Sequence, residues 1–224
     1  MLKKNIKAII ISSIIILLPL LAGLILWQRL PEQLPMHWNA AGEIDGWGSR
    51  AAVVFGESLG MLAVHWLCIA VCFADPRNKG QSGKALGLVL WVCPALSVLI
   101  GAVTYLTALG LQPFSMDKIM LIFMGLLFIV IGNYLPKGVP KCRRNYTIGI
   151  KVPWALDNEE NWNATHRFAG KLWVISGAVI VVLSFLPWAE VVFWVNIAII
   201  LIAAVASGLY SFFYYKKQQR EGRW

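Results

Sequence analysis

The chain has 224 residues, of which 58% are hydrophobic and 14% charged, and its mean hydropathy is +0.67. This composition is too apolar for a water-soluble globular domain and is typical of a polytopic membrane protein. We attribute the formal net charge of +9 to membrane topology and to contact with anionic lipid head groups. Direct binding to nucleic acid is therefore not expected.

Six apolar runs are long enough to cross a hydrocarbon core of about 30 Å. The first run is too long for the core of a signal peptide, and no small-residue cleavage site follows it, so we expect it to remain as a span. We predict an all-α fold in which residues 1–224 form a single integral membrane domain. The predicted spans are Ala8–Trp27, Ala51–Phe73, Ala85–Leu109, Ile119–Leu135, Leu172–Trp188 and Val191–Phe213.

The distribution of basic residues predicts the orientation, because cytosolic loops near spans retain lysine and arginine. With the N-terminus in the cytosol, 17 of the 20 Lys and Arg residues lie on the cytosolic side, and Arg29, Arg50 and Lys118 lie outside. We therefore predict that both termini are cytosolic. In this topology residues 28–50 form an extracellular loop, and residues 136–171 form a cytosolic loop.

The predicted extracellular loop combines polar, aromatic and glycine residues, and it has three interpretations. Its glycine, asparagine and aspartate residues fit tight turns, and its tryptophans fit an interfacial aromatic belt. Alternatively, its aromatic anchors and few polar groups suit the binding of an amphipathic peptide at the membrane surface. A third interpretation makes His37, Glu43 and Asp45 metal ligands or an acid–base set, although their spacing matches no established ligand pattern. The candidate residues of an outer-face site are His37, Trp38, Asn39, Glu43, Asp45, Trp47 and Glu57.

Glu57 is the unusual residue of the second predicted span. It follows Gly56 and precedes Gly60, a small-xxx-small pair of the kind that lets helices approach closely. A carboxylate in a span is costly unless it is protonated, paired or facing water, so Glu57 marks a functional site or else reaches Arg50 or water. His65 lies two turns deeper on roughly the same side and, with Glu57, could mark a polar cavity or proton path. A hydrogen-bonded packing histidine is the favoured alternative.

The remaining polar and reactive residues of the spans have structural explanations. We interpret Cys68, Cys72 and Cys93 as small apolar packing residues rather than as metal ligands or disulfide partners. Asn196, in the sixth predicted span, is expected to form a hydrogen bond between helices.

The predicted cytosolic loop has an extended first half and a helical second half. In the first half, Gly149 and Pro153 interrupt a run rich in β-branched residues. In the second half, Asp157 and Glu160 resemble a capping box, and the helix that they begin would continue through His166 into the fifth span.

This loop has two interpretations, contact with lipids and contact with a protein partner. A juxtamembrane basic cluster would bind anionic lipids without any protein partner. The members of this cluster are Lys137, Lys141, Arg143 and Arg144. Other residues suggest a specific local fold that could dock a soluble regulator. These are Asn145, Gly149, Lys151, Pro153, Trp154, Trp162, His166 and Arg167.

Two sets of residues resemble known signatures. The first is Pro35-Met36-His37-Trp38-Asn39 with Gly42 and Asp45–Ser49, which resembles a bacterial domain of unassigned function that opens many small membrane proteins. The second resembles the SdpI family of Sdp immunity proteins. It comprises Gly132–Pro136, Asn145, Ile148–Lys151, Pro153, Trp154, Trp162, Thr165–Arg167 and Gly170.

The resemblance implies a protein of the bacterial plasma membrane that protects its cell from a secreted, membrane-active peptide toxin. It also implies that a cytosolic transcriptional repressor is held at the membrane when the toxin is present. The expected partners are therefore a peptide toxin on the outer face, a cytosolic repressor and anionic lipids.

Three functional classes follow from these observations. The first is an immunity and signalling protein. The second is a small transporter or channel that uses Glu57 and His65. Pro19 and Pro94, which can break spans, also suggest this class. The third is a membrane enzyme that inactivates a toxin or a lipid, but the sequence contains no HExxH motif. We adopt the first class and expect no enzymatic activity, cofactor or metal.

Overall fold

A computed structural model describes residues 2–76, 83–111, 115–135, 144–147 and 149–223. The chain is 76% helical, and six of the described helical stretches are long and apolar enough to cross a membrane. The prediction of six spans is thus confirmed, whereas the orientation of the termini stays a prediction. The observed stretches are Asn5–Ile25, Arg50–Ala74, Gly87–Ala108, Met116–Tyr134, Glu159–Leu183 and Ala189–Arg220.

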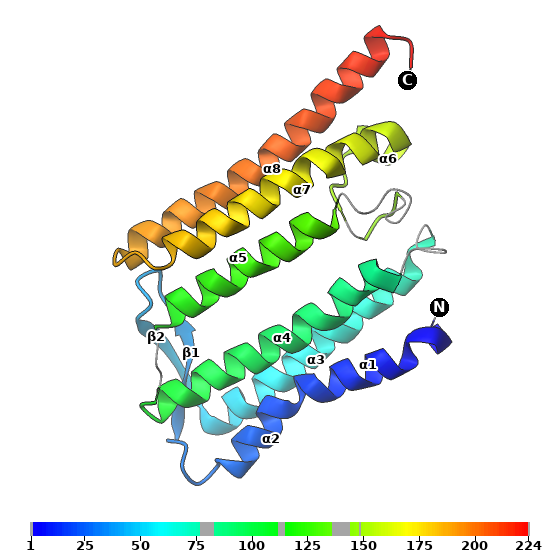
Figure 1. Ribbon diagram of the computed structural model, residues 1–224. Coiled ribbons are helices and arrows are strands. Elements are labelled where there is room, and N and C mark those ends of the chain that lie inside the picture. The colour runs from blue at the N-terminus through cyan, green and yellow to red at the C-terminus, as the bar shows by residue number, and fades with distance from the viewer. Residues whose placement is uncertain (1, 77–82, 112–114, 136–143, 148, 224) are drawn as a thin grey trace. The chain divides into compact units, whose positions relative to one another are not determined.

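The chain divides into two compact units. The first comprises Met1–Ala74 and Leu86–Met116, and the second comprises Asp75–Ala85 and Asp117–Trp224. The elements of the first unit are α1 (Leu2–Ile16), α2 (Leu18–Ile25), β1 (Gln33–Trp38), β2 (Ile44–Ser49), α3 (Arg50–Ala74) and most of α4 (Gly83–Ala108). The second unit contains α5 (Met116–Tyr134) from Asp117 onward, α6 (Pro153–Asp157), α7 (Glu159–Leu183) and α8 (Ala189–Arg220), as Figure 1 shows.

The first span is broken between α1 and α2. Pro19 has no N–H to continue the helix, and it lies in the first turn of α2, where proline is tolerated. Two hydroxyl groups of α4 compensate for the break. Ser97 Oγ donates to the carbonyl of Ile16 at 2.9 Å, and Tyr105 Oη donates to the carbonyl of Pro19 at 3.0 Å.

Pro94 behaves differently from Pro19. It lies inside α4, which continues from Gly83 to Ala108. Of the two prolines that can break a span, Pro19 therefore does so and Pro94 does not. A proline removes one helical hydrogen bond but does not have to end a helix within a membrane, where neighbouring groups can compensate.

The loop predicted at residues 28–50 contains an antiparallel hairpin, so the fold is not purely α-helical. Strands β1 and β2 pair with an irregular register, in which Leu34 faces Gly48 and His37 faces Gly46. A Cβ atom at Gly46 would lie 2.8 Å from His37 Cβ, and one at Gly48 would lie 2.9 Å from Val53 Cγ2. Glycine in these strands weakens the sequence signal for β-structure but permits the close approach of the neighbouring side chains.

Paired glycines set the packing of α5 against α7 in the second unit. A Cβ atom at Gly125 would lie 2.7 Å from the carbonyl oxygen of Gly177, and one at Gly132 would lie 2.8 Å from that of Gly170. Both helices thus place glycines seven residues apart along one contact. Small residues allow such close approach, and van der Waals contact then holds helices together in lipid. Within the same unit, α8 also lies alongside α7, so that α7 has α5 and α8 as neighbours (Figure 1).

The sequence located the helix that leads into the fifth span but misplaced its ends. Helix α7 begins at Glu159, and its N-cap is Asn158 rather than Asp157, which is the last residue of α6. Asn158 has extended backbone angles and accepts a hydrogen bond from the N–H of Asn161 at 2.9 Å. The helix ends at Leu183 and not at Trp188, because Pro187 disfavours helical geometry in the residue before it.

Replacing Asn158 with alanine removes this cap and is expected to lower the free energy of unfolding by about 1 kcal/mol. The thermal midpoint of the purified protein in detergent measures the change. Asp157→Ala is the matched control, because it removes the neighbouring carboxylate without removing the cap. An equal loss of stability in the two variants would contradict the assignment of Asn158.

Candidate functional site

Arg50 fixes the base of the hairpin (residues 33–49). Its Nη1 donates to the carbonyl oxygens of Trp27 at 2.5 Å and Leu30 at 2.9 Å, and its guanidinium carbon lies 4.7 Å from the centre of the Trp27 ring. The backbone N–H of Arg50 also donates to the carbonyl of Glu32 at 2.7 Å. Arg50 therefore joins the end of α2, the strand β1 and the start of α3. Among the described residues it makes no ion pair with Glu57.

One side of the hairpin is anchored in the apolar core of the first unit. Leu34 is fully buried, and it packs with Leu30, Val53, Val54 and Tyr105. The hairpin is thus held to α3 by apolar contacts as well as by Arg50.

The tip of the hairpin is built on Asn39. Its Oδ1 accepts hydrogen bonds from the N–H groups of Ala41 at 2.9 Å and Glu43 at 3.0 Å, which is the pattern of an Asx turn. Gly42 has a φ of 81° and completes the reversal of the chain. Asn39 Nδ2 donates to Glu43 Oε2 at 3.2 Å. Asn39 and Glu43 therefore shape the turn, in agreement with the interpretation of this loop as tight turns.

His37 and Asp45 form the polar contact across the hairpin. His37 Nδ1 lies 2.5 Å from Asp45 Oδ1, and the two side chains are 70% and 45% exposed. At this exposure the pair contributes little to stability. Glu43 bonds to Asn39 instead of joining the pair. Within the described residues, no three His, Cys, Asp or Glu side chains are grouped so that they could hold a metal ion.

The hairpin also carries exposed apolar side chains. Met36 is 61% exposed and Trp47 is 54% exposed, whereas Trp38 is half-buried. Large exposed apolar side chains on a rigid support are typical of binding surfaces. Among the tryptophans predicted for this site, Trp47 is the more accessible one.

The polar residues of the spans follow the sequence predictions only in part. His65 is fully buried, and its Nε2 lies 2.9 Å from Ser12 Oγ on α1, which confirms the interpretation as a packing residue. Asn196 is buried, but neither of its amide atoms has a hydrogen-bond partner among the described residues, so the predicted interhelical bond is wrong. The prediction of close packing at Gly56 and Gly60 is also wrong, since a Cβ at either would meet no atom of the described structure within 4 Å.

The three cysteines of the spans agree with their interpretation as packing residues. Cys72 and Cys93 are buried, Cys68 is half-buried, and none of the three forms a disulfide. The fourth cysteine of the sequence, Cys142, lies outside the described residues.

His166 of α7 is the centre of the second candidate site, which includes the signature segment (residues 144–158, of which 148 is not described). The N–H of Ile150 donates to His166 Nε2 at 3.0 Å, so Nε2 must be the unprotonated nitrogen. His166 Nδ1 therefore carries the proton and donates to the carbonyl of Trp162 at 2.7 Å. The Trp162 ring lies 4.0 Å from the imidazole, centre to centre. The buried imidazole is therefore neutral, and its role is structural: it holds the backbone of the segment at Ile150.

Gly149 is required where the segment passes over His166. Its φ is +115°, which L side chains rarely adopt, and a Cβ there would lie 2.4 Å from His166 Nε2. Trp162 would also be within 3.1 Å of that Cβ. Glycine thus allows Ile150 to reach the imidazole.

Asp75 holds the beginning of the segment. It directly follows the last residue of α3 in the chain, and its side chain is buried. Its Oδ2 accepts hydrogen bonds from the N–H of Tyr146 and from Thr147 Oγ1, both at 2.7 Å. The buried Asn145 adds a local turn, because its Oδ1 accepts the N–H of Thr147 at 2.9 Å. These bonds specify the path of the backbone.

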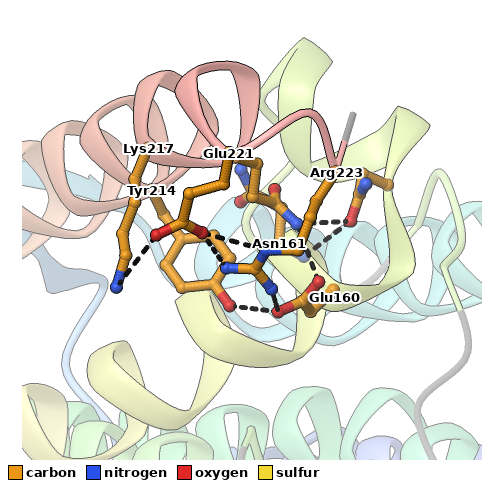
Figure 2. Close-up of polar contacts among 8 residues, drawn as sticks. Glu160, Asn161, Tyr214, Lys217, Glu221 and Arg223 are labelled. Atoms are coloured by element: carbon orange, nitrogen blue, oxygen red, sulfur yellow. Dashed lines mark hydrogen bonds and ion pairs between the residues drawn. The ribbon is translucent and has the colours of Figure 1, made fainter.

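Polar contacts also join the first turns of α7 to the end of α8. Asn161 Oδ1 accepts hydrogen bonds from Thr165 Oγ1 at 2.9 Å and Ser211 Oγ at 2.6 Å. Figure 2 shows the more exposed contacts, in which Glu160 accepts from Tyr214 Oη at 2.6 Å and pairs with Arg223 at 2.8 Å. Arg223 pairs with Glu221 as well, and hydrogen bonding to that carboxylate raises the pKa of Arg223 above its ordinary value.

The residues predicted for the second site therefore fall into two groups. Asn145, Trp162 and His166 are buried, and Trp154 packs edge-on against Phe212 of α8 at 5.3 Å between ring centres. The accessible predicted residues are Lys151, Pro153 and Arg167. Of the predicted basic cluster, Lys137, Lys141 and Arg143 lie outside the described residues, and Arg144 donates to the carbonyls of Leu156 and Asp157.

The sequence matches known proteins over both sites. Immunity protein SdpI of Bacillus subtilis (strain 168) is 31% identical to the chain, in an alignment that covers 96% of this chain and 97% of the relative. The chain belongs to the SdpI/YfhL protein family. The profile of the SdpI/YfhL family matches residues 141–214, and that of a domain of unknown function (DUF1648) matches residues 14–62. No solved structure matches the chain.

The two matches correspond to the two candidate sites of this SdpI/YfhL protein. The DUF1648 match spans the break in the first span, the hairpin, Arg50 and Glu57. The SdpI/YfhL match spans the whole signature segment, α7 and the greater part of α8. The recognised signatures therefore coincide with the parts of the chain that have specific polar geometry.

Two residues of the candidate sites are not identified from the sequence. Arg50 enters there only as a loop charge and as a group that Glu57 could reach, and Asp75 is not singled out. The signal for Arg50 was its position between a glycine-rich segment and a span. Asp75 binds Tyr146 and Thr147, which follow it by 71 and 72 positions in the chain. No local sequence pattern reveals such distant pairs.

Proposed function

We propose that this protein is a bacterial plasma-membrane immunity protein that protects its cell from a secreted peptide toxin. The observation that carries the proposal is the relation to Immunity protein SdpI over nearly the whole of both chains. The relation extends through the hairpin and the signature segment and is not limited to apolar spans, which are alike in many membrane proteins.

The hairpin is the proposed site for the toxin. An amphipathic peptide needs an apolar contact and polar groups beside it, and the hairpin supplies Met36 and Trp47 next to the His37–Asp45 pair. Arg50 and Leu34 hold this surface in a fixed position over the start of α3. Little conformational entropy is then lost on binding. The predicted topology places the hairpin on the outer face, where a secreted toxin arrives.

The signature segment is the proposed site for a cytosolic repressor. Lys151 of this segment and the nearby Arg167 of α7 are exposed and basic, so they suit an acidic surface of a protein, and they also suit anionic lipids. The buried Asn145, Trp162 and His166 act by fixing the backbone that presents these residues. We propose a binding and signalling role without enzymatic chemistry or a cofactor.

Survival of a toxin-sensitive bacterium that expresses the protein tests this proposal. We expect the wild type to protect against the Sdp peptide, and Trp47→Ala to weaken protection by about tenfold or more, as for an aromatic anchor at a binding surface. Trp188→Ala is the matched control, because Trp188 is also exposed, at 63%, but lies outside the hairpin.

Each outcome has a separate consequence. A well-expressed wild type that gives no protection would exclude the immunity function. Equal losses in Trp47→Ala and Trp188→Ala would exclude the hairpin as the toxin site. For the second site, Arg167→Glu should silence a repressor-linked reporter while protection persists, and an unchanged reporter would contradict the docking role.

A further inference from the structure

Glu57 lies on α3 two turns after Arg50, within a predicted span. Both of its carboxyl oxygens are buried, and neither has a hydrogen-bond partner among the described residues. A buried carboxylate without donors or a counter-ion is strongly unfavourable, and such a group instead takes up a proton and becomes neutral.

A notch on α4 accommodates the Glu57 side chain. A Cβ at Gly101 would lie 3.2 Å from Glu57 Oε2 and 2.5 Å from Pro19 Cβ. A larger residue at position 101 would therefore collide with Pro19 and press tightly against Glu57. Glu57 of α3 and Pro19 of α2 thus meet at the place where α4 lacks a side chain, next to the break in the first span.

The groups around the notch do not compensate a negative charge. Arg50, on the same helix, donates to the carbonyls of Trp27 and Leu30. Helix α2 carries no titratable side chain, and the Tyr105 hydroxyl of α4 donates to Pro19. His65, deeper on α3, is bonded to Ser12. Within the described residues, no cation pairs with Glu57 and no group donates a hydrogen bond to it.

We propose that Glu57 is a proton-binding site, in which a neutral carboxylic acid occupies the notch formed by α2, α3 and α4. Loss of the proton leaves a charge that only water or a cation entering the notch can stabilise. Deprotonation is therefore coupled to opening of the packing around the break in the first span. This proton-binding property goes beyond the proposed immunity function.

Infrared spectroscopy of the purified full-length protein in lipid vesicles tests the protonation state. The spectrum of the wild type should contain the carbonyl stretching band of a protonated carboxylic acid near neutral pH. That band should be lost in Glu57→Gln and should weaken as the pH is raised. Glu43→Gln, which changes an exposed carboxylate of the hairpin, is the control and should retain the band. Identical carboxylic-acid regions in wild type and Glu57→Gln would overturn the proposal.

Carbodiimide labelling provides a second measurement that does not depend on a folded variant. In dicyclohexylcarbodiimide, the O–H of a neutral carboxylic acid adds across a C=N bond, and the resulting O-acylisourea rearranges to a stable N-acylurea. Mass spectrometry of wild-type peptides should place this adduct on Glu57 and not on Glu43. Should Glu57→Gln not fold, an adduct on Glu43 but not on Glu57 would overturn the proposal. Neither measurement involves a toxin, so the proton site and the immunity function can fail independently.

Discussion

Replacing Gly149 with alanine is expected to disorder the signature segment while the membrane helices stay folded. The new Cβ would lie 2.4 Å from His166 Nε2, and the φ of +115° would be strained for any L side chain. Backbone strain of this kind costs about 1–3 kcal/mol. Moving the chain to relieve the collision would break the bond from Ile150 to His166, and each buried polar group left unpaired costs about 1–3 kcal/mol more.

Hydrogen exchange of the backbone amides measures this effect. Residues 144–153 should exchange much faster in Gly149→Ala than in the wild type. Gly222→Ala is the matched control, because Gly222 has a φ of +64° but a Cβ there would meet no atom within 4 Å. Adding His166→Ala removes the atom that collides, so the double variant should lose less stability than the sum of the single variants. Strict additivity would contradict the collision.

Replacing Gly177 with leucine is expected to have the largest effect on the second unit. A Cβ at this position would already lie 2.4 Å from the carbonyl oxygen of Gly125 and 2.8 Å from the backbone nitrogen of Ile129. Because backbone atoms cannot rotate away, α5 and α7 would have to separate. We expect a loss of about 3 kcal/mol or more, the upper end for overpacked sites.

The folded fraction after heating in detergent measures this loss. Gly208→Leu is the matched control, since Gly208 also lies within a helix but a Cβ there would meet no atom within 4 Å. We expect the control to unfold near the wild-type temperature. If Gly177→Leu were as stable as Gly208→Leu, α5 and α7 would not be packed at their glycines.

The sequence predicts the spans well because membrane insertion depends on properties that are summed over about twenty residues. It predicts interruptions poorly, since the effect of a proline depends on its surroundings. Pro19 begins a new helix, whereas Pro94 lies within a continuous one. The hairpin was not predicted because Pro35, Gly46 and Gly48 weaken the β-strand signal, although pairing within a two-stranded ribbon tolerates them.

Glycine patterns show a similar limit for the helix contacts. Gly56 and Gly60 have the familiar four-residue spacing, but no described atom packs closely there. The glycines that do form a contact, such as Gly125 and Gly177, lie on different helices, and the sequence does not say which helices are neighbours. In the signature segment, the sequence singles out Gly149, which the structure places against His166. It does not reveal Asp75, a remote residue that binds Tyr146 and Thr147 of the same segment.

The break in the first span has a consequence for biosynthesis. The hydroxyl groups that bond the carbonyls of Ile16 and Pro19 come from Ser97 and Tyr105, which are 81 and 86 residues further along the chain. A ribosome therefore releases the interrupted helix well before its hydrogen-bond partners are synthesised. Until the third span arrives, the two hydroxyl bonds that support the break cannot form. The first span should therefore reach its final depth late, together with the third.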